Sequence, residues 1–178
     1  MSLEFPELVT SRLVLEPLAA RHADGMFALW REPEVCRYSG EAHDLRGELI
    51  PLPAATPEAS GRILEFWVVR AGRGDGVRWA ALDGDGREFV GAVGFNSLGE
   101  VPELAFHLHP SAWGRGVMAE ASRAVLGWAE RALAPEGFEA FADAENVASL
   151  RLLTRLGFRE EGAERDGALR FVRARGEA

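Results

Sequence analysis

The chain contains no lysine, one cysteine and one tyrosine among its 178 residues. The absence of lysine excludes the phosphate-binding loop that requires Gly-Lys-Ser/Thr, and it excludes a Schiff-base mechanism. A lone cysteine, Cys36, cannot form an internal disulfide or build a zinc site by itself, and nothing around it marks it as a nucleophile. We therefore expect Cys36 to be a small buried or half-buried side chain.

Long apolar runs and an excess of positive charge are missing as well. No run approaches the roughly 20 residues of a membrane-spanning helix, and the opening MSLEFPELVT lacks the basic-then-apolar order of a signal peptide. The formal net charge of -8 argues against nucleic-acid binding and favours attraction of a cationic amine. We expect a soluble, cytoplasmic protein, folded as one domain over residues 1–178, with neither a nucleic-acid nor a membrane partner.

The hydrophobic patterns predict strands that mostly cluster instead of alternating with helices, which is typical of an α+β (mixed α/β) fold. The predicted strands are residues 11–18, 77–82, 88–95, 101–109, 138–144, 158–164 and 169–175. The predicted helices are residues 19–35, 56–70, 117–132 and 146–156, and residues 39–55 are predicted to form a loop.

Several local signals refine these boundaries. In the first helix, Ala23, Phe27 and Trp30 are predicted to share one face, and Pro33 to close the segment. Thr56 followed by Pro57 is typical of a helix N-terminus. The run Asp83-Gly84-Asp85-Gly86 predicts a turn between two strands, and Asp166-Gly167 predicts the turn of a terminal hairpin.

The run Gly114-Arg115-Gly116-Val117-Met118-Ala119 fits the G-x-G-x-x-G/A fingerprint of dinucleotide binding. Its position argues against a nicotinamide enzyme, because that fingerprint belongs in the first strand-turn-helix unit of a doubly wound sheet. The physical role of the glycines remains, since they allow successive N–H groups to face an anion at a helix N-terminus. Arg115 and Arg123 either add contacts to that anion or are simply solvated.

The strand before this run carries two titratable side chains on one face. Glu103 and His107 alternate with Leu104, Phe106 and Leu108, so Glu103 is either a catalytic base in a cleft or a solvent-facing glutamate. His107 is an alternative base. A metal site at His107 and His109 is disfavoured, because no further Cys/His cluster accompanies them.

In the later helix, Asn146 is predicted to be the N-cap residue. Ser149 shares the apolar face of that helix with Leu152, Leu153 and Leu156. Its hydroxyl therefore needs a partner, which is either backbone in the first helical turn or a bound ligand.

Three stretches together resemble the Gcn5-related N-acetyltransferase (GNAT) superfamily, and within it the Rim-type ribosomal-protein-alanine and small-molecule acetyltransferase branch. They are VTSRLVLEPL near the start, HPSAWGRGVMAEA in the middle and AENVASLRLLTRLGF near the end, and the resemblance covers nearly the whole chain. It implies the GNAT fold, with a mostly antiparallel twisted sheet of six to seven strands flanked by about four helices. It also implies acetyl-CoA as co-substrate, no metal, and direct transfer to an amine without a covalent enzyme intermediate.

The resemblance further implies roles for individual residues. Glu103 would act as the catalytic base, directly or through water, and Ser149 would return a proton to the CoA thiolate. The cofactor would be held by His107 and Leu108 beside the thioester, by the backbone of Trp113, Gly114, Arg115, Gly116, Val117 and Met118 at the pyrophosphate, and by Asn146 at the pantetheine arm. Trp113 is typical of the Rim-type branch, whereas Met118 replaces a smaller residue and is expected to add bulk beside the phosphates.

Three questions stay open at the level of sequence. A non-catalytic acyl-CoA-binding or regulatory protein of the same fold is the alternative to an enzyme. The amine acceptor, the length of the acyl group and the oligomeric state, a homodimer included, are not specified. The acceptor pocket is expected within residues 30–67, whose candidate contacts are Tyr38, Glu41, His43, Asp44, Glu48 and Trp67.

Overall fold

The computed structural model describes residues 3–84 and 87–176, the side chains of residues 163 and 164 excepted. Five strands form an antiparallel sheet in the order β1-β2-β5-β6-β7, namely Leu8–Val9, Leu13–Pro17, Val77–Asp83, Phe89–Phe95 and Leu104–Leu108. Three more form an antiparallel sheet in the order β8-β10-β9, where β8 is Gly137–Asp143, β9 is Arg159–Arg165 and β10 is Ala168–Ala174. The predicted α+β class with mostly antiparallel strands is confirmed, and the strands are divided between two sheets.

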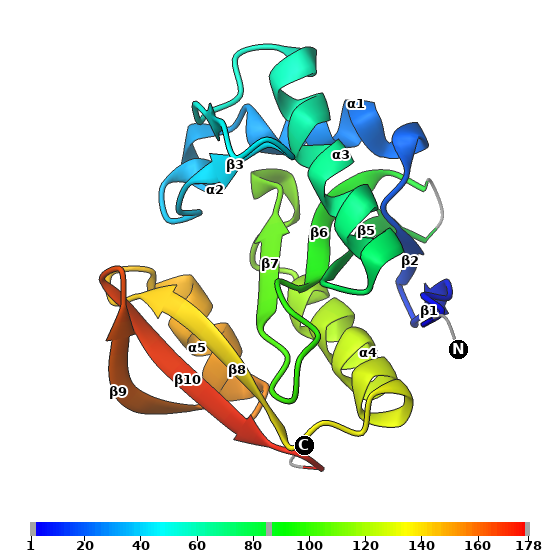
Figure 1. Cartoon of the computed structure of the whole chain (residues 1–178). Coiled ribbons are helices and arrows are strands. Elements are labelled where there is room, and N and C mark those ends of the chain that lie inside the picture. The colour runs from blue at the N-terminus through cyan, green and yellow to red at the C-terminus, as the bar shows by residue number, and fades with distance from the viewer. Residues whose placement is uncertain (1–2, 85–86, 177–178) are drawn as a thin grey trace.

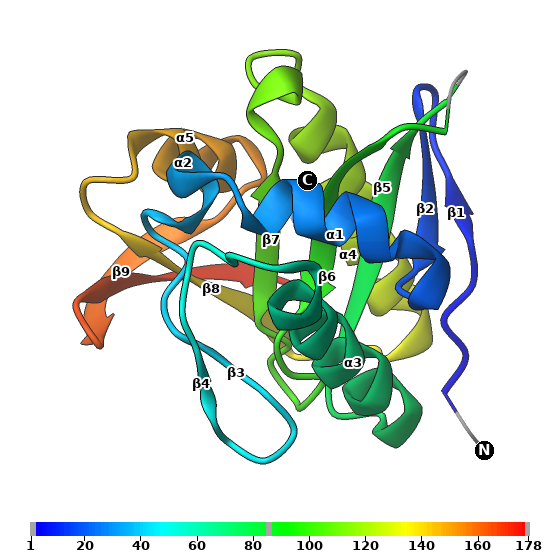
Figure 2. The same ribbon diagram turned by 90° about the horizontal axis from the view of Figure 1, so that it is seen from above.

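Helices cover both faces of the larger sheet, and the last helix packs on β8 of the smaller sheet. They are α1 (Ala23–Trp30), α2 (Pro33–Cys36), α3 (Pro57–Arg73), α4 (Val117–Ala132) and α5 (Val147–Arg155), with short 3-10 turns at Ala20–His22 and Pro110–Ala112. Figure 2 shows α1 and α3 on one side of this sheet and α4 on the other. Among the described helices, none is long and apolar enough to cross a bilayer.

Two hydrophobic clusters hold these layers together. On the α4 face, Trp79 and Trp128 meet with ring centroids 5.0 Å apart, and Phe95 and Phe138 stack at 6.1 Å. On the other face, apolar residues of α1 and α3 pack against β5 and β6. The strand β7 therefore presents Leu104 to the α4 cluster and, on its opposite side, His107 to Trp30 of α1.

The local signals are confirmed at most of their positions. The side chain of Thr56 accepts from the amide of Ala59, and that of Asn146 accepts from the amide of Ser149, so both residues cap their helices as predicted. Asp166 and Gly167 have φ of 53° and 83°, as a tight hairpin turn requires. In the predicted turn between β5 and β6, Asp85 and Gly86 lie outside the described residues.

The predicted face of α1 is right for Trp30 and wrong for Ala23 and Phe27. Ala23 is exposed and Phe27 is half-buried, whereas Met26, Leu29 and Trp30 are buried. The cause is Gly25, where an added Cβ would lie 2.3 Å from the ring of Phe89. This close approach turns the helix so that Gly25 faces the sheet. Pro33 begins the short α2, and the predicted loop 39–55 contains two short paired strands, β3 (Ala42–His43) and β4 (Leu49–Ile50).

Candidate active site

Strands β7 and β8 meet at one point and then separate, and we call the space between them the β7–β8 split. Glu103, directly before β7, forms an isolated parallel bridge with Glu139 of β8. Beyond this bridge the two strands belong to different sheets and run apart (Figure 1). Because the bridge is parallel, the loop after β7 and the start of α5 after β8 border the open end of the split. Glu103 lies at its closed end.

The carboxylate of Glu103 is buried, with 8% of the residue exposed, and one of its two oxygens is hydrogen-bonded. Its Oε1 accepts from Asn96 Nδ2 at 2.6 Å and from Arg165 Nη2 at 2.8 Å. Among the described residues, no donor is bonded to its Oε2. One oxygen is thus fixed by a charged and a neutral donor, which leaves the other free to accept a proton.

A second arginine stands behind this pair. Arg78 of β5 is 4% exposed, donates through Nη2 to Asn96 Oδ1, and lies over the ring of Trp67 at 4.1 Å from its centroid. Burial lowers the pKa of Arg78 to about 9, an effect that Glu103 opposes and Arg70 increases. Asn96 therefore links Glu103 to a buried cation and holds its carboxylate in one orientation.

Sequence reasoning missed Arg78, Asn96 and Arg165. Arg78 carried a usable signal, because it is the charged residue within the otherwise apolar run VRWAAL. Asn96 and Arg165 carried none, since they approach Glu103 only through the pairing of β6 and the fold of the terminal hairpin.

The ring of His107 packs 4.6 Å from that of Trp30. Burial there, together with the positive charge of Arg78, lowers the pKa of His107 to about 3. A ring with this pKa is neutral at pH 7 and a weak base. The structure therefore favours Glu103 over His107 as the proton acceptor.

The backbone of His107 faces the sheet and not the split. His107 pairs with Ala92 of β6. Two residues later, the amide of His109 donates to Val90 O at 2.8 Å, and His107 has the same backbone orientation as His109. Antiparallel pairing directs every second residue of β7 toward β6, so the amides on the side of the split are those of Phe106 and Leu108. This register moves the expected contact to a thioester carbonyl from His107 to its neighbours.

The loop between β7 and α4 presents a series of free amides. Gly114 and Gly116 have φ of 71° and 73°, the left-handed region that glycine adopts at no steric cost. Among the described residues, no group accepts from the amides of residues 114–119. Two glycine-permitted turns followed by the N-terminus of α4 thus form a site suited to a phosphate.

Two expectations for this loop need correction. The amide of Trp113 donates to Pro110 O at 3.1 Å, and its indole donates to Leu108 O at 2.8 Å, so the free amides begin at Gly114. Met118 is 5% exposed and belongs to the core beneath α4. The expectation that Met118 adds bulk beside the phosphates is therefore wrong.

Asn146 and Ser149 lie at the other border of the open end, in the first turn of α5. Ser149 is half-buried, and its hydroxyl has no hydrogen bond to any described residue. The backbone bond considered for this hydroxyl is thus not formed. The hydroxyl remains available to a ligand in the split.

Of the candidate acceptor contacts, Trp67 joins the network of Glu103 through Arg78. Asp44 instead organises the β3–β4 turn, accepting from Arg62 Nη2 at 2.5 Å and from the amides of Arg46 and Glu48. These bonds, that from Arg62 first, lower the pKa of Asp44 to about 2. Asp44 therefore stabilises a loop.

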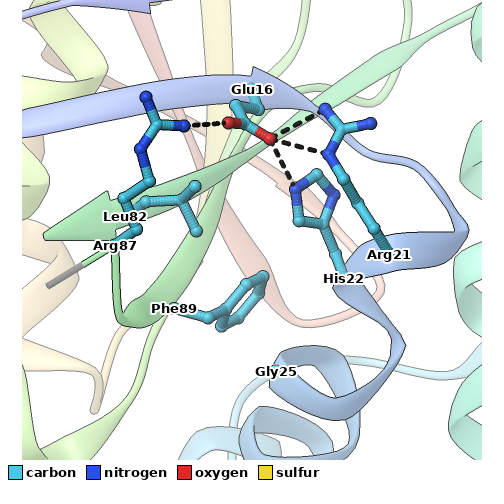
Figure 3. A pocket seen from close by; sticks show the side chains of 7 residues that line it. All are labelled: Glu16, Arg21, His22, Gly25, Leu82, Arg87 and Phe89. Carbon is cyan, nitrogen blue, oxygen red and sulfur yellow. Dashed lines mark hydrogen bonds and ion pairs between the residues drawn. The ribbon is translucent and has the colours of Figure 1, made fainter.

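A separate cavity of about 440 Å³ lies between β2, the start of α1 and the β5–β6 hairpin (Figure 3). Its centre is Glu16, which accepts from Arg21 and Arg87, each at 2.8 Å, and contacts His22 Nε2 at 3.1 Å. His22 Nδ1 accepts from the amide of Ala19, which assigns the proton of the neutral ring to Nε2. This network anchors the entrance to α1.

The cavity network predicts that acid destabilises the protein. Burial lowers the pKa of His22, and hydrogen bonding to Arg21 lowers that of Glu16, so the unfolded chain binds more protons at both groups as pH falls. The loss of stability begins as pH falls through the ordinary pKa of histidine. It continues as pH falls through the pH range in which glutamate side chains titrate. One proton taken up on unfolding corresponds to at most about 1.4 kcal/mol per pH unit.

The His22→Gln variant isolates the first of these groups, because glutamine cannot take up the proton. Urea unfolding between pH 7 and 5.5 should give a shallower decline of the unfolding free energy for His22→Gln than for wild type. His43→Gln, at an exposed histidine, is the matched control and should keep the wild-type slope. Equal slopes for all three proteins would refute the assignment of this pH dependence to His22.

Comparisons with known proteins bear on the fold and the family of the chain. A family model described as "Acetyltransferase (GNAT) domain" matches residues 12–159. YoaA of Bacillus subtilis, an uncharacterized N-acetyltransferase, is 29% identical over 164 residues, which cover 90% of this chain and 87% of that protein. A GNAT-family acetyltransferase structure from Bordetella pertussis is 27% identical, with a TM-score of 0.72 over 94% of this chain and 98% of that one. RimL in complex with coenzyme A shares the fold, with a TM-score of 0.76, 18% identity and coverage of 95% and 98%.

Proposed function

The chain belongs to the GNAT acetyltransferase family, and on this premise we propose that it acetylates a primary amine by direct transfer from acetyl-CoA in a ternary complex. Members of this family are N-acetyltransferases that use acetyl-CoA. One observation carries the finer proposal. A buried carboxylate with a free oxygen, Glu103, lies at the closed end of the β7–β8 split, and a loop of free amides lies at its open end.

The cofactor is proposed to enter the split from its open end. Its pyrophosphate would accept from the free amides of Gly114 through Met118, where the dipole of α4 adds attraction. The pantetheine arm would follow the unpaired edge of β7, with the amides of Phe106 and Leu108 available to its carbonyl groups. Asn146 borders the same channel and is proposed to contact the arm.

Glu103 is proposed to remove the proton from the incoming amine, directly or through water. At pH 7, deprotonation costs about 1.4 kcal/mol for an α-amine and about 4.6 kcal/mol for a lysine side chain, so either acceptor needs a base. The free Oε2 supplies one, while Asn96 and Arg165 hold Oε1. These two donors orient the carboxylate without occupying the reactive oxygen.

Ser149 is proposed to return a proton to the thiolate that leaves. Its hydroxyl has no partner among the described residues, and it lies in the first turn of α5, which borders the split. A covalent acetyl-cysteine step is disfavoured, since burial raises the pKa of Cys36 to about 11 and keeps it a thiol. Direct attack of the amine on the thioester therefore accounts for transfer with the groups at hand.

Titration calorimetry and thiol release test the proposal together. Wild-type protein should bind CoA and should release thiol from acetyl-CoA with at least one amine from a panel. The panel comprises peptides that begin with alanine or serine, free amino acids, a polyamine and an aminoglycoside. CoA binding without turnover on any amine would support the non-catalytic alternative, and absence of CoA binding would refute both.

Replacement of Ser149 by alanine is expected to lower kcat about tenfold. This decrease is smaller than the one usually seen when a general acid is removed, because solvent reaches this half-buried site and can supply a proton. The KM for acetyl-CoA should change less than twofold. Ser111→Ala, in the loop before α4, is a control with the same chemical change, since its hydroxyl is bonded to His109 Nδ1. An unchanged kcat in Ser149→Ala would remove Ser149 from the mechanism.

A further inference from the structure

Glu120, in the first turn of α4, is held by residues more than a hundred positions earlier in the chain. Its Oε1 accepts from Thr10 Oγ1 at 2.6 Å, from the amide of Arg12 at 2.9 Å and from Ser11 Oγ at 3.0 Å. Its Oε2 accepts from Arg12 Nε at 2.7 Å. Burial would raise the pKa of Glu120, but these hydrogen bonds outweigh it and hold the pKa at about 2.

Arg12 extends this contact into the loop of free amides. Its Nη1 donates to the carbonyl oxygen of Arg115 at 2.7 Å, and the side chain of Arg115 in turn reaches Asp83 at 3.3 Å. The carbonyl of Arg12 accepts from the amide of Gly84 at 2.6 Å. The start of β2, the end of β5 and the loop are therefore tied together at Arg12.

The bond to Arg115 fixes the direction of one amide. In a trans peptide the C=O of one residue and the N–H of the next point in opposite directions. With the Arg115 carbonyl drawn to Arg12, the amide of Gly116 must point away from Arg12. The next amide, that of Val117, is directed by α4, because the Gly116 carbonyl accepts from Glu120 N at 3.2 Å.

Glycine makes such an anchor necessary. Gly114 and Gly116 both have positive φ. Because neither residue has a Cβ, the peptide planes beside them can rotate at little steric cost. An added Cβ at Gly116 would have Arg12 Nη2 as its nearest neighbour, at 3.7 Å. Arg12 is thus the side chain placed to select one orientation of the Arg115–Gly116 peptide.

We propose that Arg12, held by Glu120, is a positioning residue that orients the Arg115–Gly116 peptide so that the Gly116 amide faces the cofactor pyrophosphate. This inference rests on the proposed function, since it takes CoA as the ligand of the loop. Glu120 contributes by fixing the guanidinium through Nε, which leaves Nη1 aimed at the Arg115 carbonyl.

The test compares CoA binding in Arg12→Gln, Arg12→Lys and Glu120→Gln with that of wild type. Arg12→Gln should weaken CoA binding in calorimetry, and raise the KM for acetyl-CoA, by about tenfold, with kcat within twofold of wild type. Arg12→Lys should restore part of the affinity, because a lysine can bond the Arg115 carbonyl. Arg131→Gln, at an exposed arginine in the last turn of α4, is the matched control and should bind CoA normally.

A spectroscopic readout separates positioning from general stability. In wild type, the Gly116 amide resonance should shift on addition of CoA, and this shift should be much smaller in Arg12→Gln. Failure of wild type to bind CoA would overturn the proposed function and this inference with it. Wild-type CoA affinity in Arg12→Gln, or a loss confined to kcat, would overturn the inference alone. If Arg12→Gln does not fold, Glu120→Gln and Arg12→Lys carry the same comparison.

Discussion

Replacing Glu103 with glutamine is expected to lower kcat by about a hundredfold or more, with little change in the affinity for CoA. Glutamine is nearly isosteric and can still accept at Oε1 from Asn96 and Arg165, so the network around it is largely kept. What is lost is the second oxygen as a proton acceptor. The measurement is steady-state thiol release at saturating acetyl-CoA, together with CoA titration of each protein.

The chain offers a close control for this substitution. Glu139 is the bridge partner of Glu103 on β8, and its carboxylate accepts from Arg170 Nε at 2.9 Å, whereas Glu103 accepts from Asn96 and Arg165. Glu139→Gln should keep kcat within about twofold. Equal activity of Glu103→Gln and wild type, over the full pH range of the assay, would exclude Glu103 as the base.

The features of the site that were predicted from the sequence each depend on residues within one short segment of the chain. The glycines at 114 and 116, the cap at Asn146 and the alternation around Glu103 each follow from residues within one turn or strand. The amphipathic period of α4 likewise predicts its bounds, because the apolar face is continuous over the whole helix.

The parts that the sequence did not predict depend on contacts between distant segments. Asn96 and Arg165 meet Glu103 from separations of 7 and 62 residues, and Arg12 meets Glu120 across 108. The rotation of α1 depends on the fit of Gly25 to Phe89, which no helical period encodes. Polar pairing and close backbone approach are properties of the assembled layers.

Gly94 provides the second large expected effect, a loss of about 3 kcal/mol or more in the free energy of unfolding on substitution by alanine. Gly94 lies in β6 opposite Arg78, and an added Cβ would lie 2.1 Å from the carbonyl oxygen of Val77 and 3.0 Å from Arg78 Cα. Both neighbours are backbone atoms of a central strand. Relief requires β5 and β6 to move apart where Arg78 supports the network of Glu103.

The same substitution at Gly61 in α3 should have the opposite sign. No atom lies within 4 Å of an added Cβ there, and alanine in a helix is favoured over glycine by about 0.5–1 kcal/mol. Because both substitutions restrict the unfolded chain to a similar degree, their difference reports the native-state clash alone. Urea unfolding should therefore separate the two variants by about 4 kcal/mol, whereas similar stabilities would mean that β5 and β6 adjust at little cost.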